Sequence, residues 1–262
     1  MSLLTAEANL DVLEKIREHE LGEARELQRA MLPEQPLRVH AVEVASEFRP
    51  VANVGGDFLD YFSLTDGTVG VYLGDVSGKG LPAALYAALA VGMFRGIHKT
   101  GVPPSQVLEL LNKRLRMRKQ VRRFCAAQYA VFDPAARTLY YSNAGLPGPL
   151  HLSGRGCDVL REGGLPAGMF EEACYSRECI ELEPGDAVLF LTDGLTEARN
   201  PAGEEFGIER VAKVCTMLDG APAHLILHQL FAEVDRFAAG RPQHDDMAAA
   251  LLKLVAARCL GR

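Results

Sequence analysis

Residues 69–92 read VGVYLGDVSGKG followed by LPAALYAALAVG, and the rest of the chain is organised around this stretch. Apolar residues at alternating positions from 69 to 73 predict a strand that ends near Asp75. Glycines then turn the chain, and the alanine- and leucine-rich segment predicts a helix with Pro82 in its first turn. A carboxylate at a strand end, beside a helix start, is a common basis for a polar site. We therefore expect Asp75 to be the centre of such a site.

Length and composition limit the class of protein. The 262 residues are 48% hydrophobic and 24% charged, which predicts one large globular domain, alone or with an appendage. A formal net charge of −6 disfavours general nucleic-acid binding. No apolar run approaches the roughly 20 residues of a membrane span, and no secretory leader is visible. The six cysteines include no Cys-x-x-Cys pair, so we expect reduced thiols, a cytoplasmic location and no membrane partner.

The first part of the chain predicts a long helix over residues 10–32, ended by Pro33. Its apolar residues fall near one stripe, which leaves two interpretations open: packing on another helix, as in a homodimer, or folding back on its own domain. We expect residues 1–36 to form a linker or dimerisation helix that passes on a signal from an upstream sensor domain. Residues 37–256 would form the main domain and residues 257–262 a tail.

The remaining pattern alternates between strand pairs and helix pairs. Strands are predicted over residues 42–48, 58–64, 69–75, 124–132, 138–142, 179–182, 187–191 and 247–255, with another near Leu150. Helices are predicted over residues 81–98, 104–117, 208–218 and 223–239. Strands joined as hairpins, with helices in pairs, indicate an α+β layered fold and not a parallel sheet of βαβ units.

Short acidic segments recur at predicted strand ends and turns. They are GGDFLD at 55–60, GDV at 74–76, TDG at 192–194 and HDDM at 244–247. Each segment alone is weak evidence for a binding site, because a lone Asp-Gly is usually a turn. Together they are less easily explained by chance. Hard oxygen ligands of this kind suit Mg²⁺ or Mn²⁺, and carboxylates crowded together repel unless a cation neutralises them.

At this point the chain resembles the SpoIIE/RsbU-type branch of the PPM (protein phosphatase 2C-like) serine/threonine phosphatases, over about residues 21–255. The matching motifs are ELQRAMLP at 26–33, FRP at 48–50, VGGDF at 54–58, GDVSGKG at 74–80, NAG at 143–145, DGLTEA at 193–198 and DD at 245–246. The resemblance implies a four-layer α-β-β-α sandwich with two central antiparallel sheets. It also implies two divalent cations, Mn²⁺ or Mg²⁺, between the sheet ends.

The resemblance further implies a set of ligands. They are Asp75, which bridges both metals, the main-chain carbonyl of Val76, Asp193 and Asp245 at the first metal, Asp57 at the second, and Asp246 as a further candidate, with Asp60 ranked last. In the wider family a histidine follows the bridging Asp-Gly, whereas this chain has Ser77. The proton donor to the leaving group is therefore left open between a metal-bound water and Lys79.

The implied activity is hydrolysis of phosphoserine or phosphothreonine by attack of a metal-bridging water, with Asp57, Asp75, Asp193 and Asp245 as catalytic residues. The implied substrate is a phosphorylated regulatory protein, such as an anti-sigma factor antagonist. The alternative is an inactive or weak phosphatase fold that binds a phosphorylated signalling partner as a scaffold. A basic run over residues 113–123 is either a solvated helix end or a docking surface for an acidic partner.

Overall fold

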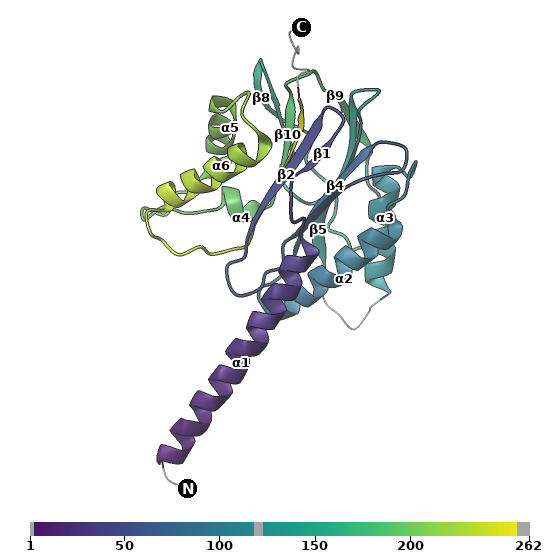
Figure 1. Cartoon of the computed structure of the whole chain (residues 1–262). Helices are drawn as coiled ribbons and strands as arrows, with labels where there is room; N and C mark the ends of the chain where they lie inside the picture. The colour runs from purple at the N-terminus through teal and green to yellow at the C-terminus, as the bar shows by residue number, and fades with distance from the viewer. Residues whose placement is uncertain (1–2, 118–122, 256–262) are drawn as a thin grey trace.

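Two antiparallel sheets form the centre of the molecule in the computed structural model, which describes residues 3–117 and 123–255 (Figure 1). The six-stranded sheet has the order β1 (Leu37–Val39), β2 (Val42–Arg49), β11 (Met247–Leu254), β10 (Ala187–Leu191), β7 (Leu150–Ser153) and β8 (Gly156–Val159). The five-stranded sheet has the order β3 (Phe58–Ser63), β4 (Val69–Val76), β5 (Cys125–Asp133), β6 (Thr138–Ala144) and β9 (Glu178–Glu181). The central strand β11, from the last part of the chain, therefore pairs with β2, from the first part.

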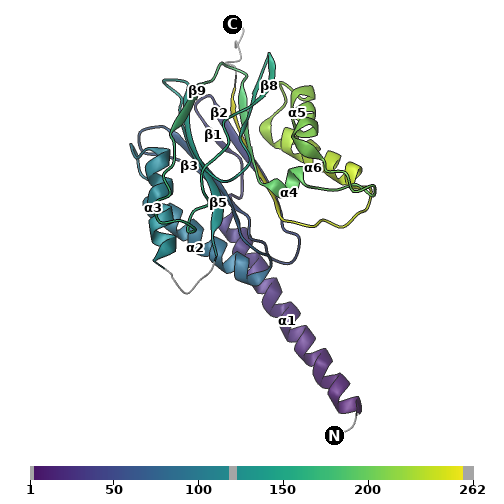
Figure 2. The same cartoon turned by 180° about the vertical axis from the view of Figure 1, so that it is seen from behind.

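Helices cover the outer face of each sheet. One pair, α2 (Leu81–Ile97) and α3 (Pro104–Arg116), packs on the five-stranded sheet, and the other, α5 (Gly207–Met217) and α6 (Ala223–Ala238), packs on the six-stranded sheet. The views from front and back show the two helix pairs on opposite sides of the sheets (Figures 1 and 2). The prediction of a four-layer α-β-β-α sandwich is confirmed.

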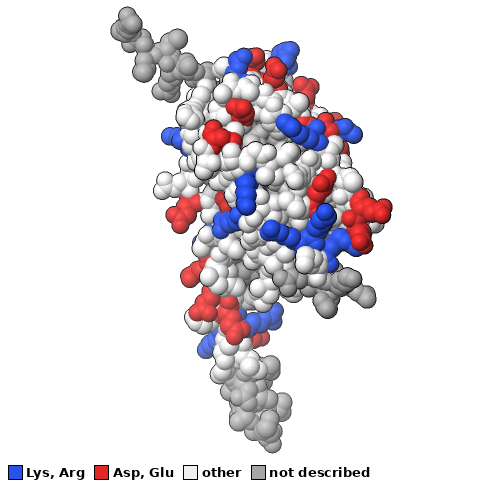
Figure 3. Space-filling model, turned by 90° about the vertical axis from the view of Figure 1, so that its right-hand side faces the viewer, with Lys and Arg blue, Asp and Glu red and all other residues white. Residues whose placement is uncertain are grey.

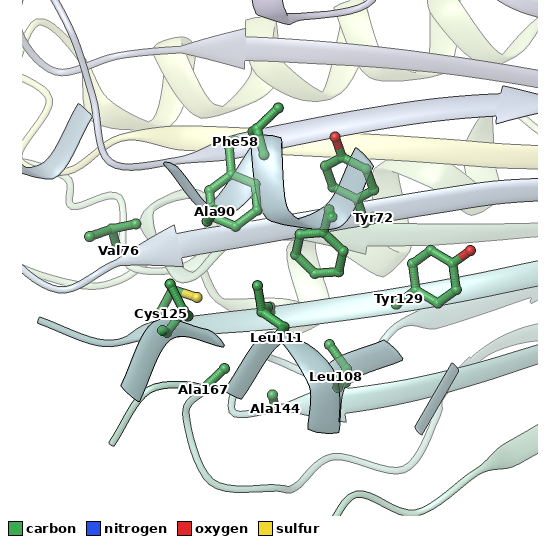
Figure 4. Packing of buried hydrophobic residues seen from close by; sticks show 14 of the residues in the cluster. Phe58, Tyr72, Val76, Ala90, Leu108, Leu111, Cys125, Tyr129, Ala144 and Ala167 are labelled. Atoms are coloured by element: carbon green, nitrogen blue, oxygen red, sulfur yellow. The ribbon is translucent and has the colours of Figure 1, made fainter. Parts of the chain in front are cut away.

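Strand β4 illustrates how residue alternation builds these layers. Val71 and Leu73 point into the cluster between the two sheets, whereas Tyr72 and Val76 point into the cluster beneath α2 and α3. Figure 4 shows this outer cluster, with Tyr72 beside residues of the helices and of β5. Because both faces of β4 are buried, its sequence is apolar or glycine at nearly every position up to Asp75. The strand thus delivers Asp75 from a rigid, doubly packed element.

Helix α1 (Leu3–Met31) projects from the sandwich, and only its last part lies beside α2 (Figures 1 and 2). All side chains at positions 11–20 are exposed, so this part does not fold back on its own domain. Nearer the domain, Leu27 is 71% exposed and Gln28 is 5% exposed. The one fully buried side chain among residues 11–31 of α1 is therefore polar.

The predicted strands and helices all occur, with ends that mostly agree within two residues, although α1 begins at Leu3 and not at residue 10. Three short elements were not predicted: β1, β8, and α4 (Asp193–Thr196). Each has at most four residues, too few to express a periodic pattern. Their formation depends on neighbours, as in the pairing of Leu37–Val39 with the start of β2.

Basic and acidic side chains are mixed on the face that carries α2 and α3 (Figure 3). In the basic run, Arg116 pairs with Glu171 at 2.8 Å, and Arg123 donates to the carbonyl of Ser77. Positions 118–122 of the run lie outside the described residues, as do the last residue of the predicted main domain, 256, and the predicted tail, 257–262. Among the helices of the described segments, none is both long and apolar enough to cross a membrane.

Candidate active site

The acidic segments meet at one end of the sandwich. In the five-stranded sheet the start of β3 pairs with the end of β4, through Phe58 and Gly74. In the six-stranded sheet the end of β10 pairs with the start of β11, through Leu191 and Ala249. Because antiparallel neighbours begin and end at the same edge, the segments before β3, after β10 and before β11 lie near the end of β4. This topology brings together acids that are up to 189 positions apart, from Asp57 to Asp246.

Asp57 is held by the opposite sheet. The residue is 2% exposed, and its carboxyl group accepts a 2.7 Å hydrogen bond from the hydroxyl of Thr192. The same hydroxyl accepts the backbone N–H of Ala248 at 2.9 Å. Thr192 is itself fully buried. One hydroxyl therefore orients Asp57, which precedes β3, against the adjacent ends of β10 and β11.

Asp246 orients the loop that precedes Asp57. Its two carboxylate oxygens accept the backbone N–H groups of Val51 at 2.7 Å and Gly56 at 2.6 Å. A Cβ at Gly55 would lie 2.5 Å from this carboxyl group, so the loop needs glycine there. Both oxygens of Asp246 thus accept backbone N–H groups of the loop. This geometry favours a role for Asp246 in positioning the loop, and not in binding a metal.

Two other glycines permit close approach of backbone at the site. A Cβ at Gly56 would lie 3.0 Å from the carbonyl oxygen of Val76, the carbonyl that the resemblance assigns to a metal. A Cβ at Gly194 would overlap the backbone carbonyl oxygen of Asp246. The glycines of the GGD and DGL motifs therefore allow neighbouring strand ends to lie in contact.

The carboxyl groups of the site are crowded enough to oppose one another's ionisation. Burial, followed by the neighbouring Asp75, raises the pKa of Asp57 well above its ordinary value. Burial, followed by the charge of Asp193, raises the pKa of Asp75 to about 7. The pKa of Asp193 is also raised, by burial and then by Asp245. The folded chain therefore concentrates negative charge that a cation would stabilise.

Among residues 3–117 and 123–255, Lys79 is the lysine or arginine that forms an ion pair with this cluster. Its ammonium group lies 2.9 Å from Oδ2 of Asp245 and donates to the backbone carbonyl of His244. It comes from the loop between β4 and α2, in which Gly78 and Gly80 have positive φ angles of 93° and 71°. Those angles favour glycine, and the turn they form brings Lys79 across to the start of β11.

The residues fit a hard divalent cation by chemistry, although they do not form a finished cage. Within residues 3–117 and 123–255, no three His, Cys, Asp or Glu side chains are grouped as a complete ligand set. The carboxylates are instead held by Thr192, Lys79 and one another. Burial and then neighbouring carboxylates raise the pKa values of Asp57, Asp75 and Asp193, and a donor set of carboxylate oxygens suits Mg²⁺ or Mn²⁺.

Asp60 and Ser77, both considered from the sequence, bond to groups other than the clustered aspartates. Asp60 accepts hydrogen bonds from Arg95 at 2.8 and 3.0 Å and from the hydroxyl of Tyr72 at 3.2 Å, so its carboxylate is committed to a structural network. Ser77 accepts the backbone N–H of Phe124 on its hydroxyl at 3.2 Å. Neither contact directs the side chain to the acidic cluster.

Gln28 is a residue of the site region that the sequence reasoning did not single out. Its side chain donates to the carbonyl of Gly55 at 2.7 Å and accepts the N–H of Gly55 at 3.0 Å. The available signal was a glutamine within the ELQRAMLP segment, among residues expected to be apolar or exposed. Gln28 therefore bonds to Gly55 of the same loop that Asp246 holds through Val51 and Gly56.

Comparison with known proteins identifies relatives of this chain. The sequence model described as Stage II sporulation protein E (SpoIIE) matches residues 65–255. The phosphoserine phosphatase RsbU of Bacillus subtilis is 26% identical over 186 residues, which are 70% of this chain and 55% of RsbU. Protein IcfG of Synechocystis is 25% identical over 268 residues, which cover 90% of this chain and 42% of IcfG.

Solved structures have the same fold. The SiaA-PP2C domain of Pseudomonas aeruginosa superposes with a TM-score of 0.81 at 22% identity, covering 92% of this chain and 98% of that domain. The chain spans about half the length of the curated relatives it matches. The part shared with the SiaA-PP2C domain is therefore the sandwich fold.

Proposed function

The chain belongs to the SpoIIE family, and on that basis we propose that it is a metal-dependent protein serine/threonine phosphatase. One observation carries the proposal. Four strand ends, two from each sheet, bring Asp57, Asp75, Asp193 and Asp245 to one edge of the sandwich. Burial and neighbouring carboxylates raise the pKa values of three of these groups, Asp57, Asp75 and Asp193, and a cluster of carboxylates from four separate segments is the arrangement expected of a site that holds hard cations.

Each side chain has a distinct part in this proposal. Asp75 would serve both cations, Asp193 and Asp245 would hold the first and Asp57 the second, and the carbonyl of Val76 would be a further ligand. When bound, such cations supply an activated water nucleophile and neutralise charge on the phosphoryl oxygens. Thr192 keeps Asp57 in place, since its hydroxyl is the closest donor to that carboxylate.

The proposed substrate is phosphoserine or phosphothreonine on a regulatory protein, such as an anti-sigma factor antagonist. The similarity to RsbU, which is named as a phosphoserine phosphatase, supports this choice. The five described cysteines are free thiols, which supports placing the activity in the reducing cytoplasm.

We further infer that α1 pairs with α1 of a second copy and passes on a signal from a sensor domain. Val12, Leu13 and Ile16 expose 51–63% of their surface on a helix that projects from the domain. A lone helix with exposed apolar side chains is marginal in water, and a second identical helix would cover them. The residues 1–36 would then be a linker and residues 37–256 the catalytic domain.

The proposal is tested with a phosphopeptide and p-nitrophenyl phosphate as substrates. We expect turnover with Mn²⁺ or Mg²⁺, loss of turnover with chelator, and loss in the Asp75→Asn variant. Asp66→Asn is the matched control, since Asp66 lies in an exposed turn, where its carboxylate bonds with Thr68. Turnover that survives chelation, or that is equal in Asp75→Asn, would overturn the proposal.

A scaffold that binds a phosphorylated partner is the competing function. It predicts tight binding of a phosphoprotein without turnover at saturating Mn²⁺. The presence of all four carboxylates at one edge favours the enzyme, because a scaffold has no need of this costly concentration of buried charge.

A further inference from the structure

Lys79 and Asp245 join two segments that are far apart in the sequence. Lys79 lies on the glycine-rich loop after β4, and Asp245 lies just before β11. The ammonium group contacts Oδ2 of Asp245 at 2.9 Å and also donates to the carbonyl of His244. A single cation therefore holds two consecutive residues at the start of β11.

Both oxygens of Asp245 are engaged in this arrangement. Oδ1 accepts the backbone N–H of Asp246 at 2.9 Å, and Oδ2 carries the ammonium group. Among the ion pairs of the described segments, this is the one in which a lysine or arginine reaches any of the clustered aspartates. Lys79 therefore supplies the one direct positive charge that this acidic edge receives from the protein there.

The ion pair is accessible to solvent. The side chain of Lys79 is 50% exposed and that of Asp245 is 35% exposed. Exposed pairs of this kind contribute little to stability and exchange readily. Lysine also presents a compact charge on a flexible chain. The contact can therefore break without disturbing the core.

We propose that Lys79 is an internal counter-cation for Asp245, which it neutralises in the metal-free protein and leaves when a divalent cation binds there. The inference rests on the proposed function, because it takes Asp245 as a metal ligand. An ammonium group and a divalent cation on the same carboxylate repel each other, so binding of one displaces the other. Lys79 would lower the affinity of the first metal and prevent unopposed charge at Asp245 before the metal arrives.

The first test is calorimetric titration of the full chain with Mn²⁺. Lys79→Gln is expected to tighten binding by about two- to fivefold, the effect of removing a competing exposed ion pair. Lys79→Arg keeps the charge and is expected to retain an affinity near that of the parent chain. Arg123→Gln removes another positive charge, one that bonds to Ser77 of the same loop, and is not expected to tighten binding. Equal affinities in Lys79→Gln and the parent, or equal tightening in Arg123→Gln, would overturn the inference.

The second test observes Lys79 directly, by ¹⁵N NMR of the lysine ammonium groups with diamagnetic Mg²⁺. We expect the Lys79 signal to shift on Mg²⁺ binding in the direction that Asp245→Asn produces without metal. A Lys79 signal that stays unchanged while Mg²⁺ binds would contradict the inference and leave the proposed function intact. A parent chain that binds neither Mn²⁺ nor Mg²⁺ would instead contradict both.

Discussion

The side chain of Gln28 forms two hydrogen bonds with the backbone of a single residue, Gly55. The amide nitrogen donates to the carbonyl at 2.7 Å, and the amide oxygen accepts the N–H at 3.0 Å. Gln28 is 5% exposed and lies near the end of α1, whereas Gly55 lies two positions before Asp57. The projecting helix is thus bonded to the loop that carries a proposed metal ligand.

Gln28→Ala is expected to weaken metal binding and turnover, although Gln28 is not itself a proposed ligand. The substitution leaves a buried N–H and a buried C=O of Gly55 without partners, at a cost of about 1–3 kcal/mol. We expect Mn²⁺ affinity and turnover to fall by roughly 10- to 100-fold, the range for loss of an outer support of a metal ligand. Titration and phosphopeptide assays measure both. Leu27→Ala, beside it on the exposed side of α1, is the control; equal losses in the two variants would contradict a role for the Gln28 bonds.

Without metal, the protein is expected to lose stability as the pH rises towards 8. The pKa of Asp75 is about 7 in the folded chain against an ordinary value of 3.8. The folded state therefore holds this proton more tightly than the unfolded state. The stabilising contribution is complete below about pH 4 and is lost as the pH rises through about 7. Asp57 and Asp193, whose pKa values are also raised, act in the same direction.

Thermal unfolding between pH 5.5 and 8, with chelator present, measures this effect. The midpoint temperature of the parent chain should fall with pH, and Asp75→Asn should flatten the fall. Saturating Mn²⁺ should restore stability most at the higher pH. A midpoint temperature that rises with pH in chelator would show that the crowded carboxyl groups do not oppose ionisation. The same conclusion would follow if the midpoint fell equally steeply with pH in Asp75→Asn and in the parent chain.

Gly194→Ala is expected to destabilise the protein by about 1–3 kcal/mol or more, as for other overpacked sites. A Cβ there would overlap the carbonyl oxygen of Asp246, a backbone atom that cannot rotate away. The shift would displace Asp193 from Asp245, so metal binding should weaken too. Chemical denaturation and Mn²⁺ titration provide the measurements. Gly92→Ala, in α2 with nothing within 4 Å of its Cβ, should be neutral or slightly stabilising; similar costs in both variants would refute the steric reason.

Pairing of α1 should be sensitive to charge on its apolar face. The double variant Leu13→Glu and Ile16→Glu is expected to halve the sedimentation mass, because four carboxylates would face one another in the dimer. Lys15→Glu adds the same kind of charge about 100° or more away from both positions and should leave the mass unchanged. A parent chain that sediments as a monomer at micromolar concentration would exclude the pairing.

Much of the architecture could be predicted from local pattern. Alternating apolar residues identify β4 and its neighbours because each strand must bury a face or both faces. The structure joins these strands as the hairpins β3–β4 and β5–β6. The unpredicted elements are those without such a pattern. In α1, the apolar stripe identified a helix but not its attachment point, since Leu27 is exposed and Gln28 is buried. A hydrogen bond to a distant backbone leaves no periodic signal.

The sequence by itself determined where the strands begin and end, and so placed an aspartate at or beside one end of each of β3, β4, β10 and β11. Tertiary structure alone decided what each aspartate does there. Antiparallel pairing within each sheet, and packing of the two sheets, bring these four strand ends to one edge. There Thr192 bonds to Asp57, backbone N–H groups bond to Asp246, and Lys79 pairs with Asp245. The physical reason is that hydrophobic periodicity acts over a few neighbouring residues, whereas the charge and hydrogen bonding of a carboxylate depend on whichever segments the folded sheets place beside it.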